Sequence, residues 1–214
     1  MTLANSGVAI VDYGLGNLKS VAEAVSFVGG KAEVTSDPHV VSGASKIILP
    51  GVGAFPVAAQ ALASSGLGEA VVHAAQRGST VLGICLGMQL LFDIGNEFEV
   101  TRGLSLLPGE VNQISIDEGP SKLRGTHIGW RNLSVENLGQ IHPLFRGIRD
   151  GESMYFVHSY AAHPSRADHL LASVKYGGSQ IVAAAGDENV FGVQFHPEKS
   201  GRAGLRVIEN FLAT

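Results

Sequence analysis

The segment Thr80-Val81-Leu82-Gly83-Ile84-Cys85-Leu86-Gly87 carries the strongest signal of the fold. Residues 80–84 form a short apolar run that predicts a buried strand of a parallel sheet. A helical pattern follows directly, over residues 86–92. Cys85 therefore lies at a strand-to-helix turn, with one glycine two residues before it and another two residues after it. Such a turn pushes the central side chain out above the sheet, and the glycines prevent collisions between neighbouring elements.

The helix that follows Cys85 favours nucleophilic chemistry at this position. Partial positive charge at the start of a helix favours a thiolate. The first backbone N–H groups point toward negative charge that develops on a bound carbonyl. The alternative is that Cys85 is a small buried hydrophobic residue, the usual state of a lone cysteine after an apolar strand. The two flanking glycines favour the nucleophile.

Strands and helices alternate around this stretch in the first 95 residues, which predicts a parallel α/β sheet. The predicted strands are 8–11, 31–35 and 46–49, and the predicted helices are 17–28, 55–64 and 67–77. Five later strands have few helices between them, so some are expected to be antiparallel additions to the sheet: 110–116, 153–158, 170–176, 179–184 and 190–195. A short helix over 204–212 closes the chain.

The sequence shows no repeat, linker or low-complexity tract, so residues 1–214 are expected to form a single domain. Its class is α/β: a mostly parallel central sheet with flanking helices and antiparallel additions in the C-terminal half. With 45% hydrophobic and 16% charged residues in 214, the chain can bury a sizeable core.

The composition excludes several classes of function. A net charge of −4 gives no basic footprint for nucleic acid. One cysteine allows no intramolecular disulfide, and the histidines show no metal-ligand spacing, so neither metal nor cofactor is expected. The N-terminus lacks signal-peptide features, and the longest uncharged stretch, 47–68, holds prolines and glycines that suit a membrane helix poorly. We therefore expect a cytoplasmic protein without a membrane contact.

A second motif, Gln194-Phe195-His196-Pro197-Glu198, ends a predicted strand. Strand residues alternate in direction, so His196 and Glu198 can project to the same side. A thiol nucleophile needs an imidazole to move its proton, and the imidazole needs an anion to fix its tautomer. The alternative is a structural histidine at a strand end beside a surface glutamate. Cys85, His196 and Glu198 together predict a catalytic triad.

The two motifs resemble those of the triad-type (class I) glutamine amidotransferases. More narrowly, the chain resembles the glutaminase subunits of imidazole glycerol phosphate synthase, an enzyme of histidine biosynthesis. The segments that carry the resemblance are Gly83–Gln89, Gln194–Ser200, Asp12–Ser20, Pro50–Phe55, Gly129-Trp130 and Val157–Tyr160.

The resemblance implies a reaction. Cys85 attacks the side-chain amide of L-glutamine, ammonia leaves, and water hydrolyses the resulting glutamyl thioester to glutamate. The ammonia passes to a separate cyclase subunit, a (β/α)₈ barrel that makes imidazole glycerol phosphate and an aminoimidazole carboxamide ribotide. No cofactor is implied.

The resemblance also assigns roles to individual residues. The oxyanion hole combines the N–H of Leu86 with one from the segment of Val52 and Gly53. Residues matched to the glutamine site are Gly51, Gln89, Glu97, Ser159 and Tyr160. Residues matched to the surface for the cyclase are Asp12, Tyr13, Asn17, Trp130 and Lys199.

Gly51 also suggests that the backbone segment expected to contribute to the oxyanion hole changes conformation between an inactive and an active state. Gly51 permits backbone angles closed to other residues, which predicts a peptide that rotates so that its N–H joins the oxyanion hole only in the active state. The alternative is a tight turn and nothing more.

Four positions depart from the family pattern. Gly95-Asn96 replaces a usual Ser-Glu before Glu97, which brings the placement of that carboxylate into question. Arg131 replaces an asparagine after Trp130, and Ile128 replaces a methionine, both near the expected partner surface.

Other functions compete with this interpretation. The glutaminase component of anthranilate synthase is one, although the Asp12–Ser20 segment and Gly129-Trp130 speak against it. A catalytically silent regulatory subunit is another, and the intact triad speaks against that. A thiol hydrolase on the same sheet would act without any partner. A dinucleotide site at Gly14 and Gly16 fails because Lys19 stands where the third glycine belongs.

Overall fold

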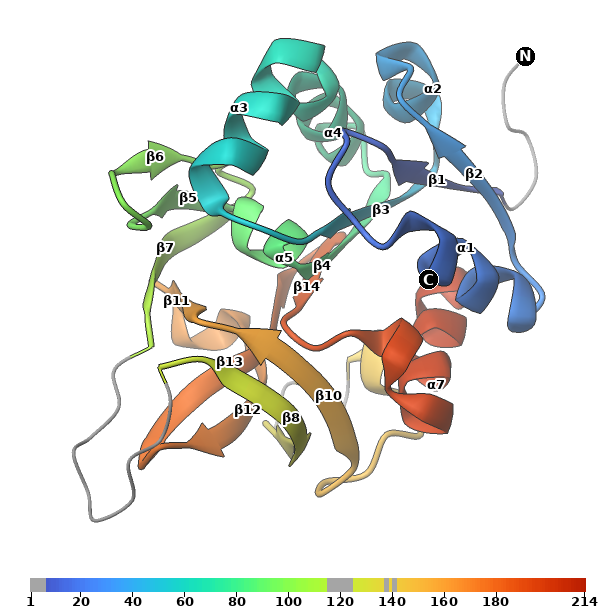
Figure 1. The fold of residues 1–214 in the computed structure, drawn as a ribbon. Coiled ribbons are helices and arrows are strands. Elements are labelled where there is room, and N and C mark those ends of the chain that lie inside the picture. Colours follow the sequence, from blue (N-terminus) through green and yellow to red (C-terminus); the bar gives the residue numbers. More distant parts are fainter. Residues whose placement is uncertain (1–6, 115–124, 137–138, 140–141) are drawn as a thin grey trace.

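A computed structural model describes residues 7–114, 125–136, 139 and 142–214 of the chain. Within them the largest sheet has eight strands, in the order β2-β1-β3-β4-β14-β13-β12-β9 (Figure 1). The first five in that order are parallel to one another, and the remaining three pair antiparallel. The strands are β1 (Gly7–Val11), β2 (Lys31–Thr35), β3 (Lys46–Gly51), β4 (Thr80–Cys85), β9 (Ser134–Val135), β12 (Leu170–Tyr176), β13 (Ser179–Asp187) and β14 (Val190–Val193).

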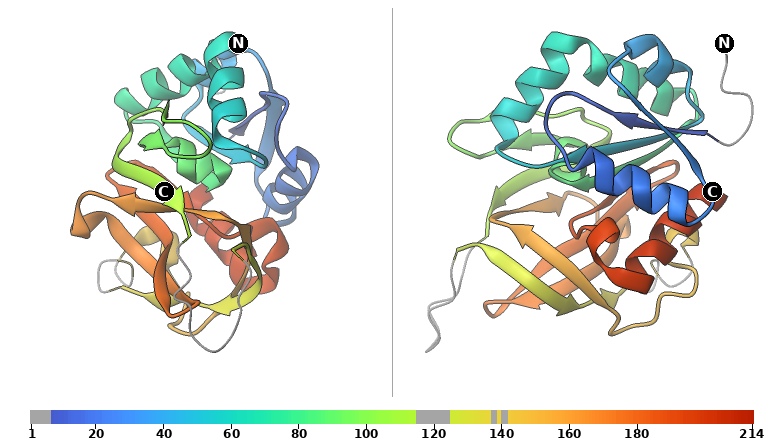
Figure 2. Two further views of the ribbon diagram at one scale, coloured as in Figure 1. Left: turned by 60° about the vertical axis from the view of Figure 1, so that its left-hand side comes forward. Right: turned by 45° about the vertical axis from the view of Figure 1, so that its right-hand side comes forward.

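Helices cover both faces of the parallel half, because its strands are apolar on both sides (Figure 2). Alternate residues of β1 belong to different core clusters. Val8 and Ile10 pack with α1 and α7 on one face, whereas Ala9 and Val11 pack with α2, α3 and α4 on the other. These helices are α1 (Leu18–Phe27), α2 (Pro38–Gly43), α3 (Phe55–Ser65), α4 (Leu67–Gln76) and α7 (Gly201–Ala213).

Two smaller sheets complete the C-terminal half. A two-stranded antiparallel sheet pairs β10 with β8, and a four-stranded sheet has the order β11-β7-β5-β6. Short 3₁₀ turns lie at Pro143–Phe145, Ala167–His169 and Pro197–Lys199. The remaining elements are α5 (Leu86–Leu90), β5 (Phe92–Gly95), β6 (Thr101–Arg102), β7 (Leu107–Gln113), β8 (His127–Asn132), β10 (Ser153–His158) and β11 (Tyr160–Pro164).

The predicted fold class is confirmed. The predictions that differ from the structure concern the boundaries of single elements. The helix predicted over 86–92 ends at Leu90, because Phe92–Gly95 pairs with β7 as a strand. The strand predicted at 110–116 runs from Leu107 to Gln113, and residues 115–116 lie outside the described part of the chain. Asn17 occupies the N-cap position of α1 and makes no side-chain cap hydrogen bond.

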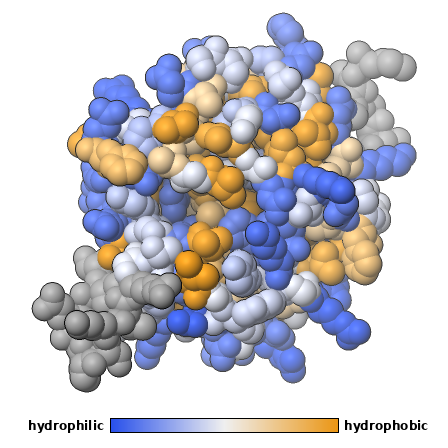
Figure 3. All heavy atoms as spheres, in the orientation of Figure 1, coloured by the Kyte–Doolittle hydropathy of each residue, from blue (hydrophilic) through white to orange (hydrophobic). Residues whose placement is uncertain are grey.

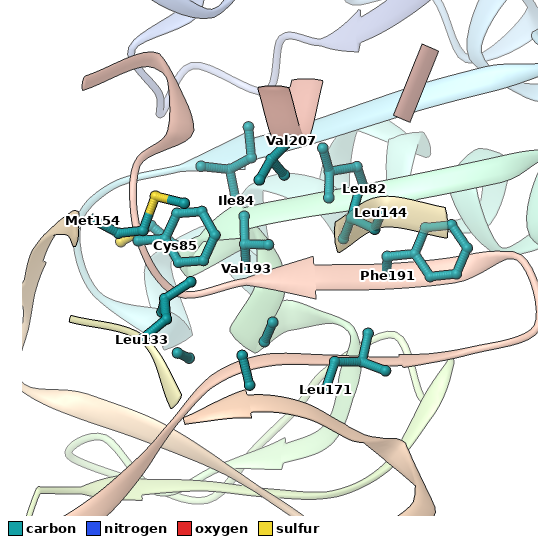
Figure 4. Close-up of a cluster of buried hydrophobic side chains, with 14 of the residues drawn as sticks. Leu82, Ile84, Cys85, Leu133, Leu144, Met154, Leu171, Phe191, Val193 and Val207 are labelled. Atoms are coloured by element: carbon teal, nitrogen blue, oxygen red, sulfur yellow. The ribbon is translucent and has the colours of Figure 1, made fainter. Parts of the chain in front are cut away.

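The order of the strands determines where the chemistry lies. β4 lies between β3 and β14 and is parallel to both, with Cys85 opposite Gly51 and Ile84 opposite Val193. The segments that leave these three strands therefore emerge together at their carboxyl ends. Figure 4 shows Ile84 and Val193 directed into one apolar cluster with Met154, which fixes this end of the sheet. In the described part of the chain, no helix is long and apolar enough to cross a membrane.

Candidate active site

Cys85 occupies a strained turn between β4 and α5. Its φ and ψ are 55° and −113°, a region that side chains disfavour and that is common at functional sites. A side chain on Gly83 would lie 2.7 Å from the backbone of Met88, and one on Gly87 would overlap the carbonyl oxygen of Leu49. The two glycines are therefore required for α5 to pack onto β3 and β4, as the sequence pattern predicts.

His196 and Glu198 lie on the chain that leaves β14. His196 Nδ1 and Glu198 Oε1 are 2.8 Å apart, and both side chains are almost completely buried. Burial opposes a charge on the imidazole, but Cys85 and Glu198 outweigh it and raise the pKa of His196 to about 9. Glu198 thus fixes the ring so that Nε2 is available for proton transfer.

The Cys85 thiol lies close enough to His196 to raise the pKa of the imidazole, but no hydrogen bond of ordinary length and angle joins them. Among the described residues, His196 Nε2 makes no hydrogen bond. The thiol instead has its sulfur 3.8 Å from the carbonyl oxygen of Val157 and 3.7 Å from Gln194 Nε2. Catalytic hydrogen bonds are often long or misaligned before substrate binds, so this geometry suits an enzyme at rest.

A cavity of about 350 Å³ opens above the thiol. Its walls come from the ends of β3 and β4, from α5, from the loop after β5, and from the junction of β10 and β11. It brings together most of the residues predicted for the chemistry, namely Val52, Gly53, Cys85, Leu86, Gln89, Glu97, Ser159, Tyr160 and His196. Gly51 and Glu198 lie behind this wall, in a smaller space that Asn17 also lines.

The sequence matches the family described as "Glutamine amidotransferase class-I" over residues 9–214. The chain belongs to this family. Among curated proteins, "Imidazole glycerol phosphate synthase subunit HisH" of Syntrophotalea carbinolica is 42% identical, covering 95% of this chain and 98% of that protein. The protein of the same name from Moorella thermoacetica is 44% identical, with 95% and 93% covered.

Solved structures agree on the fold of this amidotransferase. "Structure of PurLQS from Thermotoga maritima" matches with a TM-score of 0.72 at 22% identity, covering 97% of this chain and 98% of that one. "Crystal structure of glutamine amidotransferase" matches with a TM-score of 0.67 at 19% identity, covering 97% and 99%. At such identities the likeness concerns the fold alone.

Gln89 and Glu97 are positioned differently within the amidotransferase cavity. Gln89 donates through Nε2 to the carbonyl oxygen of Tyr160 and to Gln194 Oε1, both at 2.9 Å. Its Oε1 therefore stays available as an acceptor, which suits an ammonium group. Glu97 Oε2 accepts from the backbone N–H of Phe55 at 2.7 Å, at the start of α3.

The departure at Gly95-Asn96 leaves Glu97 in the wall of the cavity. A side chain on Gly95 would lie 2.5 Å from the ring of Phe55. The Asn96 amide donates to Glu110 at 3.0 Å and to Asn112 at 2.6 Å, on the neighbouring strand β7. The loop is thus held by contacts of its own, although its sequence differs from the family pattern.

Gly51 packs closely against its neighbours in the structure, and the predicted rotation of its peptide stays a prediction. Gly51 is not among the glycines with positive φ, whereas Gly53 has a φ of 108°. A side chain on Gly51 would overlap the Tyr13 hydroxyl and lie 2.9 Å from the nitrogen of Gly87. Gly51 is therefore needed for close packing, and the unusual backbone angle lies at Gly53. A Gly51→Ala variant would test packing and not rotation.

The residues predicted for a partner surface differ in how exposed they are. Trp130 is 51% exposed, and the ring of Tyr155 lies 5.9 Å from it and 6.0 Å from Lys199 Nζ. Asp12 is partly buried and accepts from the N–H of Gly14. Tyr13 departs from expectation, since only 8% of it is exposed. Its hydroxyl donates to the carbonyl oxygen of Pro50, and burial, with the charge of Cys85, raises its pKa.

Sequence reasoning missed a buried pair of histidines, of which His158 lines the cavity and His127 lies next to it. His158 Nδ1 lies 2.8 Å from the carbonyl oxygen of Tyr160, so it carries the proton, and His158 Nε2 accepts from His127 Nδ1 at 2.9 Å. Burial, followed by neighbouring positive charge, lowers the pKa of His127 to about 3 and that of His158 to about 4. Both imidazoles are therefore neutral at pH 7. No pattern in the sequence marks this pair.

The pair makes stability depend on pH. Below pH 6.5 these two histidines bind protons in the unfolded chain but stay neutral in the folded protein. The free energy of unfolding therefore falls as the pH drops toward 4. At pH 5 the loss is at most about 2 kcal/mol per histidine. Urea titrations at pH 7 and pH 5 measure it. His127→Phe keeps the stacking on Phe156 and Tyr176 and should reduce the drop, whereas the exposed His39→Gln should leave it unchanged.

Glu198→Gln tests how the base is oriented. The amide can no longer stabilise an imidazolium, so we expect kcat for glutamine hydrolysis to fall by roughly 10²–10⁴-fold, with a similar melting temperature. Steady-state kinetics beside circular dichroism measure both quantities. Unchanged turnover in a folded variant would show that the carboxylate of Glu198 plays no part.

Proposed function

We propose that this chain is the glutaminase subunit of an imidazole glycerol phosphate synthase in histidine biosynthesis. The observation that carries the proposal is the placement of Cys85 and the His196–Glu198 pair at the ends of neighbouring parallel strands, β4 and β14. Relatives that are 42–44% identical over 95% of the chain are named as HisH subunits of that enzyme, and not as anthranilate synthase components.

The proposed reaction uses the residues of the cavity in order. His196 takes the proton of Cys85, whose sulfur forms a bond with the amide carbon of glutamine. The oxyanion is stabilised by the N–H of Leu86 and one from Val52 or Gly53. His196 returns the proton to the leaving nitrogen, and ammonia departs. Water, deprotonated by His196, then hydrolyses the thioester, releasing glutamate and the thiol.

Within this proposal, glutamine is held by its charged end. Gln89 and Glu97 offer acceptor oxygens to the α-ammonium group, which the cavity geometry allows because both line its wall. The Ser159 hydroxyl, 2.8 Å from that of Thr126, and Tyr160 line the cavity at the junction of β10 and β11. No metal or cofactor takes part in the proposal.

The proposed partner is a (β/α)₈ cyclase that covers the mouth of the cavity. Apolar side chains group across the middle of the face in Figure 3. Val52, Ile128 and Trp130 are large apolar residues that are exposed, which supports a docking surface. The Arg131 guanidinium donates a hydrogen bond to the carbonyl oxygen of Trp130 and lies over the ring of Tyr176.

We further propose that the chain forms a single domain and that the protein is located in the cytoplasm.

Lys199→Ala tests this surface. Lys199 is exposed and directly follows Glu198, so the variant should weaken the complex and uncouple glutamine hydrolysis from synthesis without loss of stability. Lys31→Ala, on the edge strand β2, is the matched control. Affinity by calorimetry and the ratio of glutamate to product measure the effect. Wild-type values of both for Lys199→Ala would exclude Lys199 from docking. Full glutamine hydrolysis without any cyclase would instead favour a stand-alone thiol hydrolase.

A further inference from the structure

We propose that Gln194 is a positioning residue for the nucleophile: its side-chain amide donates a hydrogen bond to the sulfur of Cys85 and stabilises the thiolate. The inference rests on the proposed role of Cys85 as the nucleophile. Gln194 is completely buried, and its Nε2 lies 3.7 Å from Cys85 Sγ.

The orientation of the Gln194 amide follows from its neighbours. The carbonyl oxygen of Tyr160 can only accept, so Gln89 must direct its nitrogen there. The same nitrogen lies 2.9 Å from Gln194 Oε1, which must therefore be the oxygen. This leaves the Gln194 nitrogen facing the sulfur. A fixed backbone carbonyl thus determines, through two amides, that a donor points at Cys85.

The donor matters more once the thiol loses its proton. In the resting state the S–H group can donate to the carbonyl oxygen of Val157, 3.8 Å away. After that proton is transferred to His196, the sulfur is negatively charged. The carbonyl oxygen of Val157 then repels the sulfur, whereas the side-chain N–H of Gln194 attracts it. Hydrogen bonds to charged groups are the stronger ones. The same bond would stabilise the sulfur when it leaves the thioester.

A structural role alone explains Gln194 less well. Its backbone N–H pairs with the carbonyl oxygen of Ala183, so the sheet does not depend on its side chain. Within the described residues, both side-chain bonds lead to the cavity, one to Gln89 and one to Cys85. Burying an amide costs more than burying an aliphatic side chain, which would fill the same space.

Alkylation of Cys85 provides the test, because this is the single cysteine of the chain. The rate with iodoacetamide is measured against pH for the isolated protein, with Gln194→Met and Gln194→Glu beside wild type. The titratable groups near the sulfur are the same in every variant. His196 and Tyr13 interact with Cys85, His158, Glu97 and Tyr160 line the same cavity, and Glu198 lies behind His196. Asn210→Leu is the control, since it removes two buried amide hydrogen bonds, to Leu144 and Arg146, in another part of the core.

We expect the midpoint of the alkylation profile to move up by about one pH unit in Gln194→Met, which makes the reaction at pH 7 about tenfold slower. Gln194→Glu should move it further, because an acceptor then faces the sulfur. Asn210→Leu should lower the melting temperature and leave the midpoint in place. A wild-type midpoint in either folded Gln194 variant would overturn the proposal. Alkylation needs no cyclase, so this result stands apart from any failure of the proposed function.

Discussion

Cys85→Ser should remove glutamine-dependent synthesis by the complex, with a loss of about 10⁴-fold or more, and leave ammonia-dependent synthesis within about twofold of wild type. The reason lies in the division of labour in the proposal, since Cys85 acts only on glutamine and the partner consumes ammonia. A serine hydroxyl has a much higher pKa than a thiol, and His196 deprotonates it poorly. The substitution is nearly isosteric in a site where the side chain is buried.

The measurement is the rate of product formation with glutamine and, separately, with an ammonium salt. The thermal transition of the variant and its affinity for the cyclase serve as controls, because a misfolded variant would lose both activities. Persistent glutamine hydrolysis at the wild-type rate would show that Cys85 is not the nucleophile. Loss of the ammonia-dependent rate in a folded, bound variant would contradict the separation of the two activities.

Gly87→Ala should destabilise the protein by about 3 kcal/mol or more and remove glutaminase activity. Alanine gains about 1 kcal/mol in helix propensity over glycine, which alone would stabilise α5. The added methyl group, however, would overlap the carbonyl oxygen of Leu49 and lie 2.7 Å from the carbonyl carbon of the same residue. Both atoms belong to the backbone of β3, so the helix itself must shift, and with it the turn that holds Cys85.

Gly43→Ala is the matched control for this packing effect. Gly43 also lies in a helix, at the end of α2, and a methyl group there would meet nothing within 4 Å. We expect a change within about 0.5 kcal/mol. Urea titrations of the two variants at pH 7 give the comparison. Equal stability of Gly87→Ala and Gly43→Ala would refute the close approach of α5 to β3.

The parallel half of the fold was predictable because its signals are local. Apolar runs bounded by turn residues mark β1, β3 and β4, and the glycine spacing around Cys85 marks the turn. The strands β8 and β11 were missed. Polar and apolar residues mix in both of them, and each is stabilised by a distant partner strand, β10 or β7. Such pairing leaves little trace in a single sequence.

The residues of the candidate site were also predictable only where the signal is local in sequence. Cys85 and His196 stand in recognisable motifs, whereas the donor from Gln194 depends on contacts between residues about a hundred positions apart. The burial of Tyr13 was not predictable for a related reason. Its neighbours in sequence suggest a surface loop, but its hydroxyl reaches Pro50 at the end of β3. Burial of this kind follows from tertiary packing and not from local pattern.

In the function proposed above, this chain takes the amide nitrogen from glutamine through Cys85 and supplies it to the cyclase. The most direct test is the nitrogen isotope in the imidazole product, formed by the complex from nitrogen-15 amide-labelled glutamine in the presence of excess unlabelled ammonium. We expect labelled product from the wild-type complex and unlabelled product from the Cys85→Ser complex. Labelled product from the Cys85→Ser complex, or product from the wild-type complex that carries only the nitrogen of the ammonium salt, would contradict it.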